Sequence, residues 1–185
     1  MFIETDVTPN PATLKFLPGR VVLEQGSADF DNAEAAAISP LAKVLFELPA
    51  VERVFLGSDF VSVTKSDDVA WPALKPQVLG AIMEHYLSGR PVMMSDAAAA
   101  AEDVDPEDRA IADQIKELLD ARVRPAVAGD GGDIVFRGYR AGVVTLHMQG
   151  ACSGCPSSTA TLKMGIENLL RHYVPEVTSV QQVAA

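Results

Sequence analysis

The first 95 residues contain runs with the period of strands. Residues 51–56 and 60–65 are rich in β-branched and aromatic side chains, and the polar turn 57–59 between them predicts a hairpin. Residues 13–17 alternate in the same way and stop at Pro18-Gly19, which is typical of a strand followed by a turn. We therefore expect a small sheet in this part of the chain.

Two helices are predicted beside these strands. Ser39 suits an N-cap and Pro40 the first helical residue, and the positions that follow form one apolar face: Leu41, Val44, Leu45 and Leu48. A second helix has its body marked by Val78, Ile82 and Tyr86 and stops at Gly89. Its start is expected to be broken up by Pro72 and Pro76.

The chain after residue 105 has a more regular pattern. Asp105 is expected to cap a helix that ends at Pro125, and the positions on one face of that helix are Ile111, Ile115, Leu118, Leu119 and Arg122. The turn 129–132 leads into strands over 133–137 and 143–148. A closing helix stops at Pro175, before a final strand within 177–183, and its predicted stripe is Thr159, Leu162, Ile166, Leu169, Leu170 and Tyr173.

An acidic, alanine-rich stretch divides the chain. Residues 96–108 contain six acids and no base, so they carry −6, while residues 1–95 carry −5 and residues 109–185 carry +1. Self-repelling charge favours an extended connector, although an alanine-rich helical extension fits the same composition. The predicted fold class is α+β: two small α/β sandwich-like domains, over 1–92 and 107–185, joined by an acidic, alanine-rich linker over 93–106.

Composition narrows the choice of partners. The 185 residues include 25 acidic and 15 basic side chains, a net charge of −10, which disfavours nucleic acid because that binding depends on Lys and Arg. The longest apolar run, 97–101, is far below the roughly 20 residues of a membrane span, so no membrane partner is expected. No secretory signal is readable at the start. We expect a cytoplasmic protein if the source is bacterial and a mitochondrial matrix protein if it is eukaryotic.

Cys152 and Cys155, the two cysteines of the chain, carry the clearest chemical signal. They lie three positions apart between a predicted strand and a predicted helix, so both thiols can face one object. Pro156 fits the first helical position, which places the thiols beside unpaired N–H groups and the positive end of the helix dipole. That environment favours the thiolate, which binds metals and attacks disulfides. Backbone N–H groups around Gly150 and Gly154 would also stabilise a bound anion.

Three chemistries fit this pair: a redox dithiol, a zinc site and an iron–sulfur site. A structural role as two buried apolar side chains is disfavoured, because a tight turn is a poor place to bury thiols. A thioredoxin-like dithiol needs further strands after its helix, and only 30 residues follow Cys155. His147 lies in a strand and His172 near the far end of a helix, so we expect the histidines to be surface or packing residues.

Both metal sites usually require four ligands, and one chain offers two thiols. Two chains related by a two-fold axis could each supply a pair. A cluster held in this way should be exposed and easily surrendered, which suits a carrier better than an electron-transfer protein. Structural zinc in the same arrangement and a thiol–disulfide module remain the alternatives.

At this point a family resemblance is evident. Residues 150–158, followed by 161–163 and 165–170, closely resemble the C-terminal domain of NifU, which Nfu proteins share. Residues 8–16, with 39–42 and 59–61, resemble the N-terminal domain of Nfu proteins. The two stretches together cover nearly the whole chain outside the acidic linker.

The resemblance implies an iron–sulfur cluster carrier or scaffold that is not an enzyme. It implies Cys152 and Cys155 as ligands of a [4Fe–4S] cluster, or of a [2Fe–2S] cluster, bridged between two subunits of a homodimer. It also implies an upstream cluster assembly scaffold as donor. Apo iron–sulfur proteins such as aconitase-type dehydratases and lipoyl synthase are the implied recipients. The N-terminal domain is implied to contact partners and to carry no cluster ligand.

Overall fold

The computed structural model describes residues 1–94, 101–153 and 156–183, with side chains from residue 159 onward in the last range. The chain divides into two compact units, Met1–Ala98 and Ala99–Ala185. Each unit combines helices with a sheet of its own, which confirms the predicted two-domain α+β class.

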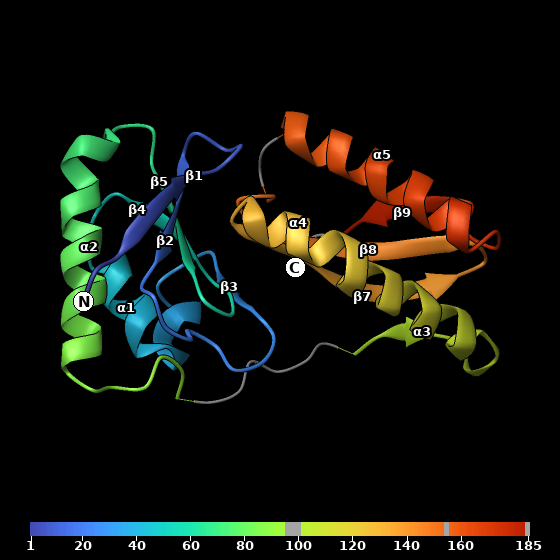
Figure 1. Cartoon of the computed structure of the whole chain (residues 1–185), viewed down its shortest axis with the longest axis horizontal. Coiled ribbons are helices and arrows are strands. Elements are labelled where there is room, and N and C mark those ends of the chain that lie inside the picture. The colour runs from blue at the N-terminus through green and yellow to red at the C-terminus, as the bar shows by residue number, and fades with distance from the viewer. Residues whose placement is uncertain (95–100, 154–155, 184–185) are drawn as a thin grey trace. The chain divides into compact units, whose positions relative to one another are not determined.

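The first unit is built on an antiparallel sheet of five strands (Figure 1). The strands lie in the order β1-β2-β5-β4-β3, and their bounds are β1 Glu4–Val7, β2 Thr13–Leu17, β3 Ala28–Phe30, β4 Val51–Leu56 and β5 Val61–Lys65. The predicted hairpin is confirmed as β4 and β5, which pair Val54 with Val63. Both of these side chains are fully buried in the core of this unit.

Helices α1 (Pro40–Phe46) and α2 (Trp71–Leu87) pack on this sheet, after a short 3-10 helix over Ala35–Ile38. The predicted cap is confirmed, because the Ser39 hydroxyl accepts a hydrogen bond from the Ala42 N–H at 3.1 Å. The predicted break at the start of α2 is wrong. Pro72 lies in the first turn, where its missing N–H costs nothing, and Pro76 removes one intrahelical bond from a helix that buries three apolar side chains: Leu74, Val78 and Ile82.

The second unit is a four-stranded sheet in the order β6-β7-β8-β9 (Figure 1). Its strands are β6 Asp103–Val104, β7 Gly132–Arg140, β8 Val143–Gly150 and β9 Ser179–Gln182, with β7 and β8 antiparallel and the two outer strands parallel to their neighbours. The predicted strands over 133–137, 143–148 and 177–183 correspond to β7, β8 and β9. Alternate residues of β8, among them Val144, Leu146 and Met148, share one core with the helices.

The helices of this unit are a 3-10 turn over Pro106–Asp108, α3 (Arg109–Leu118), a π-helical turn over Leu119–Val123, α4 (Arg124–Gly129) and α5 (Pro156–Tyr173). The predicted stop at Pro125 is wrong, because Pro125 occupies the first turn of α4 and the wide π turn before it lets the chain continue. Asp105 makes no capping hydrogen bond, so that prediction is also wrong. Its carboxylate lies 3.8 Å from the Arg140 guanidinium instead.

The acidic stretch is in part a piece of the second sheet rather than a free connector. Asp103 and Val104 pair with Gly138 and Tyr139 of β7, and the Asp103 carboxylate accepts a hydrogen bond from Arg140 at 2.7 Å. The predicted connector or helical extension over 96–100 lies outside the described residues. A side chain at position 138 would run into the Asp103 backbone, so this pairing depends on Gly138.

Candidate metal centre

Cys152 lies on a tight turn between the end of β8 and the start of α5. Gly150 adopts a φ of 65°, a conformation that favours glycine, and the Ser153 N–H donates to the Gly150 carbonyl at 3.0 Å. The Thr159 hydroxyl, one turn into α5, donates to the Cys152 carbonyl at 3.0 Å. The Cys152 backbone is thus fixed from both the strand side and the helix side.

Cys152 is only 7% exposed and belongs to the core of the second unit. The expectation that a tight turn cannot bury a thiol is therefore wrong for this residue. The physical reason is that the neighbouring strand presents no side chain at this point, because Gly132 of β7 pairs with Gly150 at the end of β8. Cys155 lies outside the described residues, so its place relative to Cys152 stays a prediction.

Electrostatics at the start of α5 favour a negative charge. This helix has 18 residues, carries no acidic side chain in its first turn, and has Arg171 and His172 in its last turn. The unpaired N–H groups and the positive dipole end of such a helix stabilise a nearby thiolate. A cysteine on a turn that leads into such a helix is a donor of the kind that holds an iron–sulfur cluster.

The turn between α4 and β7 is hydrogen-bonded to the cysteine turn. The Ala151 N–H donates to the Gly131 carbonyl at 3.1 Å, so the residue before Cys152 is tied to the α4–β7 turn. Gly131 itself adopts a φ of 81°. From the sequence, residues 129–132 are predicted only as a turn into a strand. The sequence signal for this contact was the run of glycines at the start of β7, since β7 pairs with the strand that leads into the cysteine turn.

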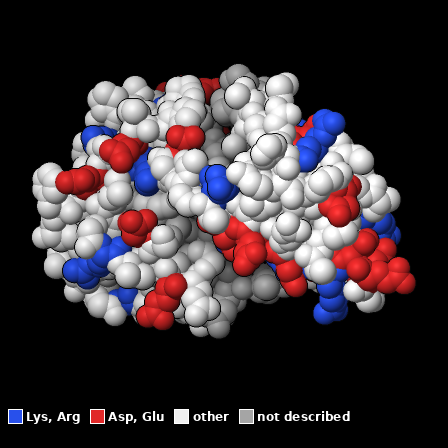
Figure 2. All heavy atoms as spheres, turned by 45° about the vertical axis from the view of Figure 1, so that its right-hand side comes forward, with Lys and Arg blue, Asp and Glu red and all other residues white. Residues whose placement is uncertain are grey.

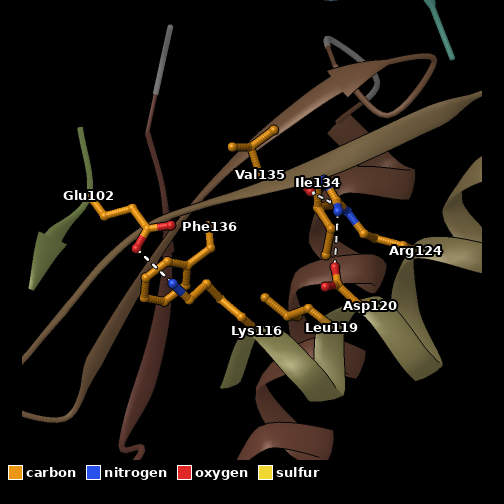
Figure 3. Close-up of a pocket in the computed structure, with 8 residues that line it drawn as sticks. All are labelled: Glu102, Lys116, Leu119, Asp120, Arg124, Ile134, Val135 and Phe136. Atoms are coloured by element: carbon orange, nitrogen blue, oxygen red, sulfur yellow. Dashed lines mark hydrogen bonds and ion pairs between the residues drawn. The ribbon is translucent and has the colours of Figure 1, made fainter. Parts of the chain in front are cut away.

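A hollow of about 160 Å³ lies where α3 and α4 meet β7, and Figure 3 shows the eight residues that line it. Its charged groups bond one another. Lys116 Nζ donates to Glu102 Oε2 at 2.9 Å, lies 3.4 Å from Asp113 Oδ1, and stands over the Phe136 ring. The hydrogen bond to Glu102 raises the pKa of Lys116. These contacts hold Glu102, just before β6, to α3.

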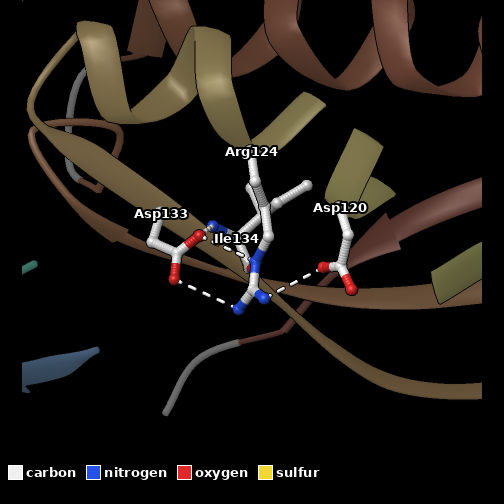
Figure 4. A network of polar contacts seen from close by, with 4 residues as sticks. All are labelled: Asp120, Arg124, Asp133 and Ile134. Atoms are coloured by element: carbon white, nitrogen blue, oxygen red, sulfur yellow. Dashed lines mark hydrogen bonds and ion pairs between the residues drawn. The ribbon is translucent and has the colours of Figure 1, made fainter. Parts of the chain in front are cut away.

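On the other side of the hollow, Arg124 joins the helices to the start of β7 (Figure 4). Its Nε and Nη2 donate to the two carboxylate oxygens of Asp133 at 3.1 and 3.2 Å, and its Nη1 donates to Asp120 at 2.9 Å. The Nε also lies 3.3 Å from the Ile134 carbonyl. This two-pronged contact with Asp133 fixes the residue directly after Gly132.

The buried histidines have packing roles, as expected. His147 is 4% exposed, and its Nδ1 lies 3.1 Å from the Val183 carbonyl. His85 is 3% exposed on α2, where its ring meets that of Tyr86 edge-on. Over the described parts of the chain, no three His, Cys, Asp or Glu side chains are grouped so that they could hold a metal ion.

The surface shows no preference for one sign of charge on the side seen in Figure 2, where blue and red groups lie beside one another. Among the described helices, none is both long enough and apolar enough to cross a bilayer.

Comparison with known proteins assigns a class to both units. Residues 3–89 match the family model "Scaffold protein Nfu/NifU N terminal", and residues 115–181 match the "NifU-like domain". The second match contains the cysteine turn and most of the residues that support it. The first covers the five-stranded sheet and its helices.

The chain belongs to the NifU-like (Nfu) family. It is 55% identical to "NifU-like protein 4, mitochondrial" and 54% identical to "NifU-like protein 5, mitochondrial", both of Arabidopsis thaliana, over 98% of its length. It is 52% identical over 99% of its length to "NFU1 iron-sulfur cluster scaffold homolog, mitochondrial" of Drosophila erecta. The chain spans about two thirds of these relatives, 66%, 68% and 65% of their respective lengths.

Proposed function

We propose that this protein is an iron–sulfur cluster scaffold that holds its cluster on Cys152 and Cys155 of two protomers and passes it to apo-proteins. The observation that carries the proposal is the cysteine turn. A thiol follows a β-strand, its carbonyl is fixed by Thr159, and a long helix without acids in its first turn begins just after it. Membership of a family with relatives named as iron–sulfur cluster scaffold homologs supports the same role.

The ligand count supports a shared cluster. A [4Fe–4S] or [2Fe–2S] cluster is commonly held by four thiolates, and the chain contains two cysteines. Two protomers about a two-fold axis supply four. Since each chain then holds only half of the site, binding of the cluster and association of the protomers are linked by mass action. We propose a [4Fe–4S] cluster in a homodimer, and a monomer-leaning apo form.

Release proceeds by ligand exchange without a change of redox state. A thiolate of the recipient forms a bond to a cluster iron, and the bond from that iron to a Cys152 or Cys155 sulfur breaks. The released thiolate then takes a proton from solvent. The cargo moves when each of the four donor thiolates has been replaced by a ligand of the recipient or by solvent, so the protein acts as a carrier rather than as an enzyme. Its donor is an upstream assembly scaffold, and its recipients are apo iron–sulfur proteins of the aconitase-type dehydratase and lipoyl synthase classes.

The first unit contributes no cysteine, because both cysteines lie in the second. We therefore propose that it contacts partners, while the second unit carries the cluster. Its compact, separate core fits this division of labour. The named relatives are mitochondrial proteins, so we propose the mitochondrial matrix as the compartment if the source is eukaryotic.

Anaerobic reconstitution of the full chain tests the proposal. We expect a coloured dimer on size-exclusion chromatography, with about two iron and two sulfide per protomer for a shared [4Fe–4S] cluster or about one of each for a [2Fe–2S] cluster. Cys152→Ala should abolish the colour while the first unit stays folded. His172→Gln, at an exposed position near the end of α5, is the matched control and should load like the wild type.

Other results would assign a different chemistry. A coloured, fully loaded monomer, or a Cys152→Ala variant that keeps its colour, would contradict the shared site. A colourless dimer that contains zinc would indicate the structural zinc alternative, because zinc is d¹⁰ and does not absorb visible light. Disulfide reductase activity without bound metal would indicate the thiol–disulfide module.

A further inference from the structure

The space beside Cys152 is shaped by a residue twenty positions earlier in the chain. A Cβ atom on Gly132 would lie 2.8 Å from the Cys152 Sγ, 3.1 Å from the Cys152 backbone nitrogen and 2.6 Å from the Gln149 carbonyl oxygen. Cβ atoms essentially never lie within 3.0 Å of a heavy atom of a non-neighbouring residue, so any residue larger than glycine must displace the Gln149 carbonyl, the Cys152 sulfur or β7 itself. The sulfur thus lies against bare backbone of β7.

Both sides of this contact are fixed. Gly132 and Gly150 are direct partners on the last rung of β7 and β8, and the Gly131 carbonyl holds the Ala151 N–H. Asp133, the next residue along β7, is held by the two-pronged contact with Arg124. Neither the strand nor the cysteine turn can therefore shift freely to make room. A methyl group at position 132 would press on both the Gln149 carbonyl at the end of β8 and the Cys152 sulfur on the turn that follows.

We propose that Gly132 is a positioning residue for Cys152. Its missing side chain leaves a seat in which the ligand thiol lies shielded within the protomer, 7% exposed, and in a defined place at the start of α5. The proposal rests on the proposed function only in that Cys152 is taken as the ligand. The seat keeps the thiol from reacting with solutes before a cluster arrives, and it defines the geometry from which the thiol engages iron.

Native-state alkylation tests the seat without any cluster. In a Cys155→Ser background, Cys152 is the only thiol, and its reaction with iodoacetamide can be followed by mass spectrometry. We expect it to react at least about tenfold more slowly in the folded protein than in urea, since a buried thiol reacts through local opening. Gly132→Ala should recover most of that difference. If the folded Cys155→Ser protein reacts as fast as the unfolded chain, the proposal is overturned even if the Gly132→Ala variant fails to fold.

Two glycine variants separate positioning from loss of stability. Gly129→Ala adds a methyl group in open space three residues before the seat and should leave the alkylation rate within about twofold of wild type. Gly142→Ala strains the turn at the opposite end of β8, where the φ is 82°, and should destabilise the unit without reaching Cys152. If Gly142→Ala, matched for lost stability, exposes the thiol as much as Gly132→Ala does, the seat is overturned.

A double-mutant cycle checks the sulfur contact itself. If the methyl group at 132 meets the sulfur, Gly132→Ala should cost less stability in a Cys152→Ala background than in the wild type. Strictly additive effects would contradict a contact between the two side chains.

Cluster loading then distinguishes the seat from the proposed function. We expect Gly132→Ala to retain about tenfold less cluster than Gly129→Ala after desalting, because one of the ligands is misplaced. If no variant loads a cluster but Gly132→Ala still exposes the thiol, the proposed function is wrong, while the role of Gly132 in positioning Cys152 is supported. If the wild type loads and Gly132→Ala matches Gly129→Ala in both loading and alkylation, the seat fails and the proposed function stands.

Discussion

The two units use close-packed glycines differently. In the first unit, a Cβ at Gly57 would meet the ring of Phe60, a side chain of the core. In the second unit, Gly132, Gly138 and Gly142 would each meet the backbone of a neighbouring segment. At these positions the first unit packs an aromatic ring against a glycine. The second unit brings main chains together at Gly132 and Gly138, and at Gly142 it packs the Thr178 side chain and the Glu176 carbonyl against the glycine. The proposed ligand turn lies beside Gly132, where an added methyl group would meet both the Gln149 carbonyl and the Cys152 sulfur.

The largest expected effect is the loss of stability when a buried leucine is truncated in either core, and it tests whether the two cores unfold independently. Leu45 in the first core and Leu170 in the second are both fully buried, and truncation of such a residue to alanine costs about 2–5 kcal/mol. Trp71, the only tryptophan, lies on α2 of the first unit, so its fluorescence reports that unit alone. We expect Leu45→Ala to shift the urea transition seen by Trp71. Leu170→Ala should shift only the transition of the second unit, seen by circular dichroism; an equal shift at Trp71 would show one cooperative core.

The contrast between the glycines predicts the next effect. Gly142→Ala places a methyl group close to Thr178 and Glu176 at a positive φ, so we expect a loss of about 1–3 kcal/mol from the second unit. Gly165→Ala, in open space within α5, should instead gain up to about 1 kcal/mol from its better helix propensity. Urea unfolding followed by circular dichroism measures both. A stabilised Gly142→Ala variant would refute the claim that this position requires glycine.

A smaller effect is expected at the ionic contact that fixes the start of β7. Arg124→Met keeps the length of the side chain but removes its bonds to Asp133 and Asp120. Because Arg124 is partly exposed, we expect a loss of about 1 kcal/mol or less. The loss should be smaller in an Asp133→Asn background, and a double-mutant cycle by urea unfolding measures that coupling. Equal losses in both backgrounds would mean that the two residues act independently.

The smallest effect distinguishes the buried histidines of the two units. Within the described residues, neither ring nitrogen of His85 has a hydrogen-bond partner, whereas His147 contacts the Val183 carbonyl. Burial, and then the charge of Arg90, lower the pKa of His85 below 6.5. The unfolded chain therefore binds this proton at a higher pH than the folded chain does. Stability of the first unit should fall as the pH drops through 6.5 toward the lowered pKa of His85.

His85→Leu should flatten that pH dependence, which cannot exceed about 1.4 kcal/mol per pH unit for a single proton. Trp71 fluorescence in urea, compared at about pH 7.5 and about pH 5.5, measures it. The exposed His172→Gln variant serves as the control. An unchanged slope in His85→Leu would mean that another group controls the acid sensitivity of the first unit.

Features with a local cause were predictable from the sequence. Ser39 caps α1 because its hydroxyl reaches a backbone N–H three residues ahead, and β4 and β5 form a hairpin because a polar turn joins two β-rich runs. The short strand β6 was missed because two residues have no period. What holds them is pairing with β7, distant in the sequence, and the ion pair to Arg140.

In the candidate site, too, features with a local cause were predictable and features that depend on distant residues were not. The position of Cys152 between a strand and a helix could be predicted from neighbouring residues. Its burial could not, because the space for its sulfur is left by Gly132, which becomes a neighbour only when β7 and β8 pair. The helix through Pro125 was missed for a related reason. Proline normally ends a helix, but here the π turn and the contacts of Arg124, which both come before Pro125 in the chain, keep the chain helical.

The pairing of β6 with β7 limits the length of chain that connects the two units. Met94 donates its N–H to the Ile38 carbonyl in the first unit, and Asp103 is already part of the second sheet. The residues between these two attachment points can span at most roughly 30 Å even when fully extended. If the first unit captures a client, as proposed above, so short a connection would hold that client at a local concentration on the order of millimolar for the second unit. Under the proposed function, transfer would then depend on the length of this connection as much as on affinity, and lengthening it should slow transfer.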